Sequence, residues 1–100
     1  MQNLQSILKN ISIFHSAEEL EVAVEELRKL SPAAKRILAE AIENTGISRE
    51  KASAAVISLE NAGFVNLHEK IYPTSVDIVP TLLGEDVMLA LDVINDAKQK

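Results

Sequence analysis

The side chains best suited to chemistry in this chain are cations and hydroxyls gathered at one expected helix start. Ser48, Arg49 and Lys51 follow a glycine and open a helix that we expect over residues 48–61. The N-terminus of a helix carries unpaired amides and a partial positive charge, so it can receive a phosphate group. Phosphate contacts of this kind position proteins on duplex DNA. The pattern therefore predicts binding to a nucleic-acid backbone, with a merely solvated helix start as the alternative.

Other polar side chains extend this candidate site. Ser53 and Asn61 lie on the same expected helix and can hydrogen-bond to bases or phosphates, although exposed serine and asparagine usually face water. Lys35 and Arg36 lie near the start of the preceding helix, where they can reach the flanking backbone. The candidate nucleic-acid site on these two helices is therefore Lys35, Arg36, Ser48, Arg49, Lys51, Ser53 and Asn61.

The charge of the chain limits any such binding. The formal net charge is −5, which speaks against indiscriminate phosphate binding. Residues 31–70 are neutral, because five basic side chains are balanced there by five acidic ones. The excess acid lies in residues 18–26 and 77–96. With so few cations, we expect the salt dependence of DNA binding to be shallow.

Two apolar residues on the expected helix indicate a different kind of partner. Ala54 and Ile57 are three residues apart, on the side that Ala55, Val56 and Leu59 do not occupy. An apolar patch on such a helix suits contact with a protein better than contact with DNA. The alternative is that a neighbouring helix of the same chain covers both side chains.

The sequence gives little support for catalysis. His15 and His68, the only histidines, lie in different elements and lack companions at metal-ligand spacing. A solvated helix face explains the glutamates between residues 18 and 26. The chain has three glycines, and none belongs to a phosphate-binding loop or a nucleophile elbow. We therefore expect no cofactor, no metal site and no enzymatic activity.

Composition predicts a single globular domain. Hydrophobic residues make up 47% of the chain and charged residues 25%, proportions that favour a folded chain over a disordered one. The absence of cysteine excludes disulfides and favours a reducing, cytoplasmic location. No apolar run approaches the roughly 18–20 residues of a membrane span. Residues 1–16, with Lys9 as their only cation, do not have the pattern of a signal peptide.

The elements that position the candidate site begin with helices. Ser16, with Glu19 three residues later, predicts a capping box at the start of a helix that ends near Lys29. Ser31-Pro32 predicts the next start, because proline at the first helical position loses only an unpaired amide. Gly46 is expected to end that helix through a positive φ. The expected inward positions of these two helices are Leu20, Ala23, Val24, Leu27, Ala34, Ile37, Leu38, Ala41 and Ile42.

After the helix at 48–61 the sequence pattern predicts two strands and then another helix. Gly63 is expected to end that helix, whose inward face is Ala52, Ala55, Val56 and Leu59. Alternating apolar residues then predict a strand. The expected order is a strand at 64–67, a turn at 68–70, a returning strand from residue 71 to 80, and a helix at 85–97.

The terminal segments carry more apolar residues than one core stripe needs. Residues 3–14 form a helical stripe, and residues 85–97 are apolar over more than half of a helix circumference. Pairing both across a two-fold axis would give an isologous homodimer. Packing of both ends on their own domain is the alternative. The expected dimer interface is Leu4, Ile7, Leu8, Ile11, Val87, Leu91 and Ile94.

About half of the chain resembles the winged-helix transcription regulators of the multiple-antibiotic-resistance-regulator type. The residues that carry the resemblance are Gly46-Ile47-Ser48, then Leu59 to Val65 with its leucine-glutamate-x-alanine-glycine order, then Thr81-Leu82-Leu83-Gly84. The resemblance implies that residues 48–61 are the recognition helix in the major groove. It also implies that the hairpin around His68–Tyr72 is the wing, with Lys70 and Tyr72 at the backbone or flanking groove, and that the terminal helices build a homodimer.

The sequence therefore predicts a mainly α fold with a small antiparallel β-hairpin. We expect one winged helix-turn-helix domain over residues 1–100, with N-terminal helices in 1–30, the helix-turn-helix and wing in 31–84, and a C-terminal helix in 85–100. The first expected function is a cytoplasmic, dimeric transcription regulator that binds duplex DNA. The alternative is a winged-helix module that binds a protein through Ala54 and Ile57.

Overall fold

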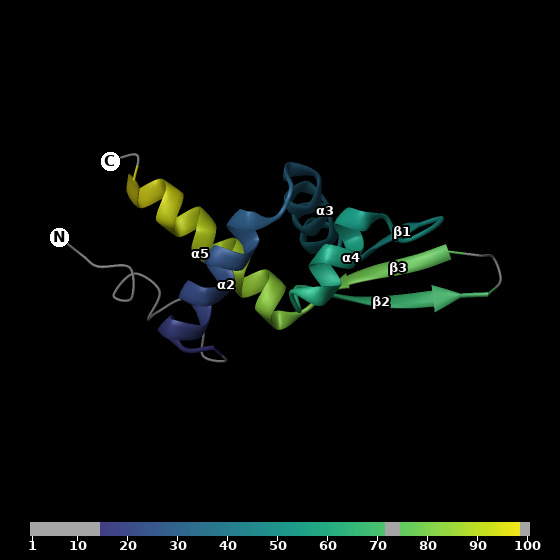
Figure 1. The fold of residues 1–100 in the computed structure, drawn as a ribbon, viewed down its shortest axis with the longest axis horizontal. Helices are drawn as coiled ribbons and strands as arrows, with labels where there is room; N and C mark the ends of the chain where they lie inside the picture. Colours follow the sequence, from purple (N-terminus) through teal and green to yellow (C-terminus); the bar gives the residue numbers. More distant parts are fainter. Residues whose placement is uncertain (1–14, 72–74, 99–100) are drawn as a thin grey trace.

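The chain forms a small mixed α/β domain in which helices pack beside a three-stranded antiparallel sheet (Figure 1). The structure is a computed structural model, and it describes residues 15–71 and 75–98. In chain order the elements are α2 (Ala17–Lys29), α3 (Pro32–Glu43), β1 (Ile47–Arg49), α4 (Ala54–Asn61), β2 (Val65–Lys70), β3 (Ser75–Pro80) and α5 (Leu82–Lys98). The predicted β-hairpin is confirmed as β2–β3, and β1 adds a third strand.

The starts of α2 and α3 confirm Ser16 and Ser31 as the predicted N-cap residues. The Ser16 hydroxyl accepts a hydrogen bond from the Glu19 amide, and the Ser31 hydroxyl accepts one from the Ala34 amide, each at 3.1 Å. These bonds satisfy amides that the first helical turn leaves unpaired. The inward stripes are also as expected, with Leu20, Ala23, Val24, Leu27, Ala34, Leu38 and Ala41 buried.

The end of α3 differs in detail from the prediction. Thr45 has a φ of 53° and occupies the left-handed position directly after the C-cap, while Gly46 follows with a φ of 114°. The Gly46 amide donates to the Ala41 carbonyl at 2.7 Å, and the Thr45 amide donates to the Ile42 carbonyl at 3.3 Å. This is a Schellman ending, which satisfies two carbonyls that the last turn leaves unpaired. Gly46 therefore ends the helix together with a threonine whose backbone is strained.

The predicted helix at 48–61 is wrong in its first part. Residues 47–49 form the short strand β1, and α4 begins at Ala54 with Ser53, not Ser48, as its N-cap. The Ser53 hydroxyl accepts a hydrogen bond from the Val56 amide at 3.3 Å. Ser48 instead pairs with Asp77 of β3, 29 residues further along the chain. This distant pairing overrides the local capping signal, as tertiary context commonly overrides propensity.

The sheet has the order β1-β3-β2, so β3 lies in the centre. Val65 pairs with Pro80 and Lys70 with Ser75, which makes His68–Lys70 part of strand β2 and not the predicted turn. The returning strand begins at Ser75, later than expected. Strand alternation places Val65 and Leu67 on the inner face, opposite Pro80 and Ile78. The outer face carries polar residues, namely Ser48, Asn66, His68, Lys70, Ser75 and Asp77.

A Thr-x-x-Gly step joins the sheet to α5, which begins at Leu82 rather than at residue 85. The Thr81 hydroxyl donates to the Gly63 carbonyl at 2.7 Å and accepts from the Gly84 amide at 2.9 Å. Gly84 lies so close to the Phe64 backbone that a Cβ there would overlap the Phe64 carbonyl oxygen. Threonine and glycine are therefore required by this junction between two elements.

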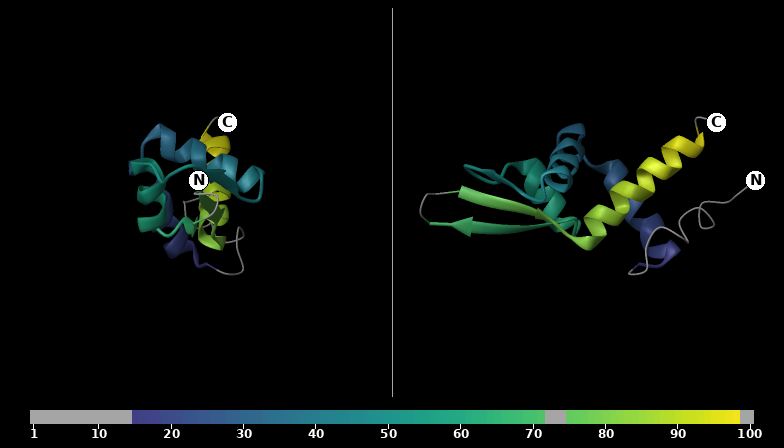
Figure 2. Two further views of the ribbon diagram at one scale, coloured as in Figure 1. Left: turned by 90° about the vertical axis from the view of Figure 1, so that its right-hand side faces the viewer. Right: turned by 180° about the vertical axis from the view of Figure 1, so that it is seen from behind.

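The core joins α2 and α5 at one end of the molecule to α3, α4 and the sheet (Figures 1 and 2). Val87 and Ile94 of α5 are buried against this core within a single chain. Leu91 is partly buried and packs against the same cluster. The predicted dimer interface is therefore wrong for Val87 and Ile94, because α2 of their own chain already covers the stripe they belong to. Leu4, Ile7, Leu8 and Ile11 lie outside the described residues.

Candidate functional site

Helix α4 exposes a face that carries no cation. Val56 and Leu59 are buried beneath it, whereas Ala54, Ile57 and Asn61 are exposed at helical spacing. Ile57 keeps 45% of its surface exposed, so no neighbouring helix within the described chain covers it. The only charged residue of α4 is Glu60. This face therefore offers apolar and amide groups to a partner, and no cation.

Arg49 is held by α3 and does not stand at a helix start. From strand β1, its Nη2 donates to both carboxylate oxygens of Glu40, at 3.0 and 3.1 Å. Its Nη1 donates to the Ser48 carbonyl at 3.1 Å. The predicted position of Ser48, Arg49 and Lys51 at a helix N-terminus is wrong, because residues 47–49 form β1 and the helix end lies at Ser53.

Lys70 belongs to a polar network on the outer face of the sheet. Its Nζ lies 3.0 Å from Oδ2 of Asp77, while the Ser48 hydroxyl donates to Oδ1 of Asp77 at 2.6 Å. The hydrogen bond from Ser48 and then that from Lys70 hold the pKa of the Asp77 carboxyl below its ordinary value, with a smaller contribution from His68 and a partial opposing effect of desolvation. The sequence did not single out Asp77; only the strand register brings it to Ser48 and Lys70.

The network borders a shallow hollow of about 300 Å³ on this face. It is lined by polar and apolar groups from three elements and the turn after α3. These residues are Thr45, Gly46, Ile47, Ser48, Lys70, Asp77 and Val79. Two predicted site residues, Ser48 and Lys70, are therefore brought together here, but around a carboxylate that neutralises the lysine.

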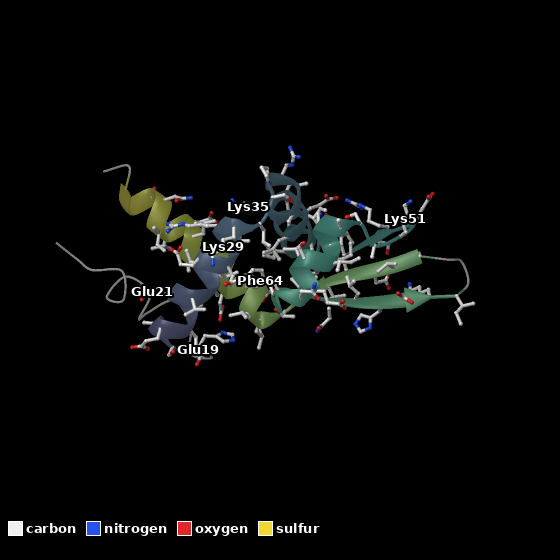
Figure 3. The ribbon with its side chains drawn as sticks, viewed as in Figure 1. Glu19, Glu21, Lys29, Lys35, Lys51 and Phe64 are labelled. Carbon is white, nitrogen blue, oxygen red and sulfur yellow. The ribbon has the colours of Figure 1, made fainter. Side chains whose placement is uncertain are left out.

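The other predicted cations do not gather at one place. Lys35 turns towards α2 and donates to the Arg28 carbonyl at 3.3 Å. Lys51 lies near the far end of β1, well away from Lys35 (Figure 3). Within the described part of the chain, Arg36 and Lys51 make no ion pair and no side-chain hydrogen bond. Tyr72 lies outside that part.

A larger hollow lies at the opposite end of the domain, where α2 meets α5 and the connection from α4 to β2. Its volume is about 570 Å³. Its floor is apolar, and its rim carries carboxylates of α2. These glutamates were expected to form a solvated helix face. The signal that could have revealed the groove is the helical stripe formed by Glu19, Val22, Ala23 and Glu26.

Neither a cluster of metal ligands nor a membrane-spanning helix occurs in residues 15–71 and 75–98. No three His, Asp or Glu side chains among those residues lie close enough together to bind a metal ion. None of the helices there combines the length and the apolar character of a membrane span.

Comparison with known proteins found no matching family model, no similar curated protein and no similar solved structure. The function must therefore be inferred from the chemistry of the surfaces described above.

Proposed function

We propose that this chain is a winged-helix domain that binds a protein partner through the outer face of α4. One observation carries the proposal: α4 exposes Ala54, Ile57 and Asn61, while Arg49 of β1 and Lys70 of β2 are paired with carboxylates. The element order of helix, strand, helix and hairpin is compatible with a winged helix. In that fold α4 takes the place of the recognition helix, and β2–β3 takes the place of the wing.

The charge arrangement makes protein a better partner than DNA. Binding to duplex DNA gains most of its affinity when lysine and arginine replace counterions along the phosphates. Here Arg49 and Lys70 already neutralise Glu40 and Asp77, and the chain as a whole carries a net charge of −5. Burial of an exposed aliphatic side chain against an apolar protein surface contributes a binding free energy of about 25 cal/mol for each Å² removed from water.

Sequence-specific DNA binding is the second candidate, because one observation favours it. Arg36 and Lys51 are exposed and make no ion pair within residues 15–71 and 75–98. The Arg49–Glu40 pair is also about half exposed at both side chains, and exposed pairs contribute only about 0–1 kcal/mol. A phosphate can therefore compete for Arg49. In that case the cations would lie around α4 and not on it.

The protein-binding proposal is tested with a matched pair of substitutions. Ile57→Asp places a charge on the outer face of α4, and Leu89→Asp places one on α5 at a similarly exposed aliphatic, 48% against 45%. We expect both variants to keep the parent's circular dichroism spectrum. A protein from the native host that is captured by the parent should be lost with Ile57→Asp and retained with Leu89→Asp. Equal retention by both variants would contradict a role for α4.

The DNA candidate is tested by fluorescence anisotropy with fragments of the host genome at about 50 mM salt, where phosphate contacts are strong. If DNA is the partner, the parent binds and the double variant Arg36→Gln with Lys51→Gln binds at least about tenfold more weakly. The control is Arg28→Gln with Lys29→Gln, which removes the same charge from α2. We expect no saturable binding by the parent, and saturable binding that only the first double variant weakens would replace our proposal with the second candidate.

A further inference from the structure

The larger hollow is a groove built mainly by one stripe of α2. We call it the α2 groove and define it by its described lining residues, which are His15, Glu18, Glu19, Val22, Ala23, Glu26, Ala62, Phe64 and Leu83. Ala62 and Phe64 come from the connection between α4 and β2, and Leu83 comes from the first turn of α5. Three separate parts of the chain therefore meet at the groove.

The floor and one wall of the groove are apolar. Ala23 and Phe64 are buried at its base, and Ala62 and Leu83 are partly buried beside them. Val22 stands on the wall with 63% of its surface exposed. Leu82, directly before Leu83 in the chain, is 52% exposed. The exposure of Val22 shows that the hollow is open along α2, which favours an extended occupant over a compact small molecule.

The rim of the groove is acidic. Glu18, Glu19 and Glu26 all project from α2, and the described lining residues include no lysine or arginine. Lys29 lies 3.7 Å from Glu26, and His15 is paired with Asp86 at 2.7 Å. Glu19 of the rim and Phe64 of the floor are both labelled in Figure 3. The charge at the rim is therefore negative where the floor is apolar.

The spacing of the rim fits a helix. Glu19 and Glu26 are seven residues apart on one helix, a rise of about 10 Å. On a docked helix, basic residues at positions i and i+7 are separated by the same distance. Apolar residues between them, at i+3 and i+4, then face the floor. Laying an amphipathic helix into an apolar groove is a common mode of protein recognition.

We propose that the α2 groove binds a basic amphipathic helix of a partner protein. The aliphatic side chains of that helix occupy the floor formed by Ala23, Phe64 and Leu83, and its lysines or arginines lie against the glutamates of the rim. This surface is separate from the outer face of α4, because neither Ala54 nor Ile57 lines the groove. The proposal therefore goes beyond the proposed function and does not depend on it.

The test uses two synthetic peptides and the full chain. The basic probe has lysines at helical i and i+7 spacing and leucines between them at i+3 and i+4, over about four turns. Its acidic twin keeps the leucines and replaces every lysine with glutamate. We expect the fluorescently labelled basic probe to bind saturably, and the acidic twin to bind at least about tenfold more weakly at physiological salt.

Matched variants locate the binding. Glu18→Gln with Glu19→Gln should weaken the basic probe about three- to tenfold, because two exposed ion pairs are lost. Glu43→Gln with Glu60→Gln removes the same charge outside the groove and should leave the affinity unchanged.

Val22→Ser should weaken binding, whereas Leu89→Ser, at an exposed aliphatic outside the groove, should not. Ile57→Asp should also bind the probe normally, so this test and the α4 test can fail separately.

Three results would overturn the proposal. One is no saturable binding of the basic probe by the parent chain. Another is equal affinity for the two peptides, which would indicate unspecific apolar adhesion. The third is equal weakening by both pairs of glutamate substitutions, which would indicate attraction by overall charge and not by the groove.

Discussion

Among single residues, Asp77 has the largest effect on the predicted nucleic-acid site. It accepts hydrogen bonds from Ser48 of β1 and Lys70 of β2, two residues that the sequence analysis assigned to nucleic-acid contact. An aspartate on the central strand can reach both neighbouring strands, because cross-strand partners face each other across the sheet. The charge of Lys70 is therefore balanced on the outer face of the sheet, where one carboxylate links three strands.

The lowered pKa of Asp77 predicts how stability depends on pH. A carboxyl whose folded-state pKa lies below its ordinary value of 3.8 stabilises the fold fully above that pH. The stabilisation is lost as the pH falls below 3.8 through the folded-state pKa. We expect Asp77→Asn to lower Tm at neutral pH by a small amount, since its partner Lys70 is about half exposed, and the difference from the parent to vanish in acid. Thermal unfolding at both pH values measures this.

The control for this prediction is Asp92→Asn, which removes an exposed carboxylate of α5 that is not part of the network. It should change Tm less than Asp77→Asn at neutral pH. A Tm difference for Asp77→Asn that persists unchanged well below pH 3.8 would show that the carboxylate does not stabilise the sheet through its charge.

Among the elements, the junction of β3 and α5 is the most tightly constrained. Thr81 joins it to the end of α4 by donating to the Gly63 carbonyl, and its amide donates to the Phe64 carbonyl at 3.0 Å. Gly84 lets the first turn of α5 pass against that same Phe64 carbonyl. Three elements therefore meet at a point where there is room for a backbone but not for a side chain.

This close approach predicts a reversed effect for a common stabilising substitution. Glycine to alanine inside a helix usually stabilises by up to about 1 kcal/mol. At Gly84 the new Cβ overlaps the Phe64 carbonyl oxygen, which is backbone and cannot move aside alone. We expect Gly84→Ala to lower the free energy of unfolding by about 1–3 kcal/mol. Urea denaturation measures it, with Leu82→Ala at an exposed position of the same turn as a control that should change little.

The elements also show which features the sequence could and could not predict. The caps at Ser16 and Ser31 and the ending at Gly63 depend on neighbouring residues, so local patterns were sufficient. Strand β1 was missed because its partner, β3, lies 29 residues away and the segment 48–51 has good local signals for a helix. Asp77 and Glu40 were not recognised as partners of Lys70 and Arg49, because only the pairing of the strands and the position of β1 beside α3 bring these side chains together. The residue types of the site were therefore predictable, but the pairing of its cations with carboxylates was not.

At the scale of the whole molecule, the core decides which surfaces remain for partners. Val87 and Ile94 of α5 are buried in the core of a single chain. They belong to the apolar stripe that was predicted to form a dimer interface. Among the described residues, the exposed aliphatics include Val22 on the wall of the α2 groove and Ile57 on the outer face of α4. Their separation favours two distinct contact surfaces over one continuous interface.

The homodimer stays a prediction, and two substitutions on α5 separate it from core packing. Ile94 is 3% exposed, so Ile94→Glu should remove the fold by placing a charge in the core. Leu89 is 48% exposed, so Leu89→Glu should leave unfolding by urea unchanged. If α5 joins two chains, light scattering gives the parent a mass near twice 10.9 kDa and gives Leu89→Glu the mass of one chain. A folded Ile94→Glu variant with half the parent's mass would instead place Ile94 at the interface and contradict its burial within one chain.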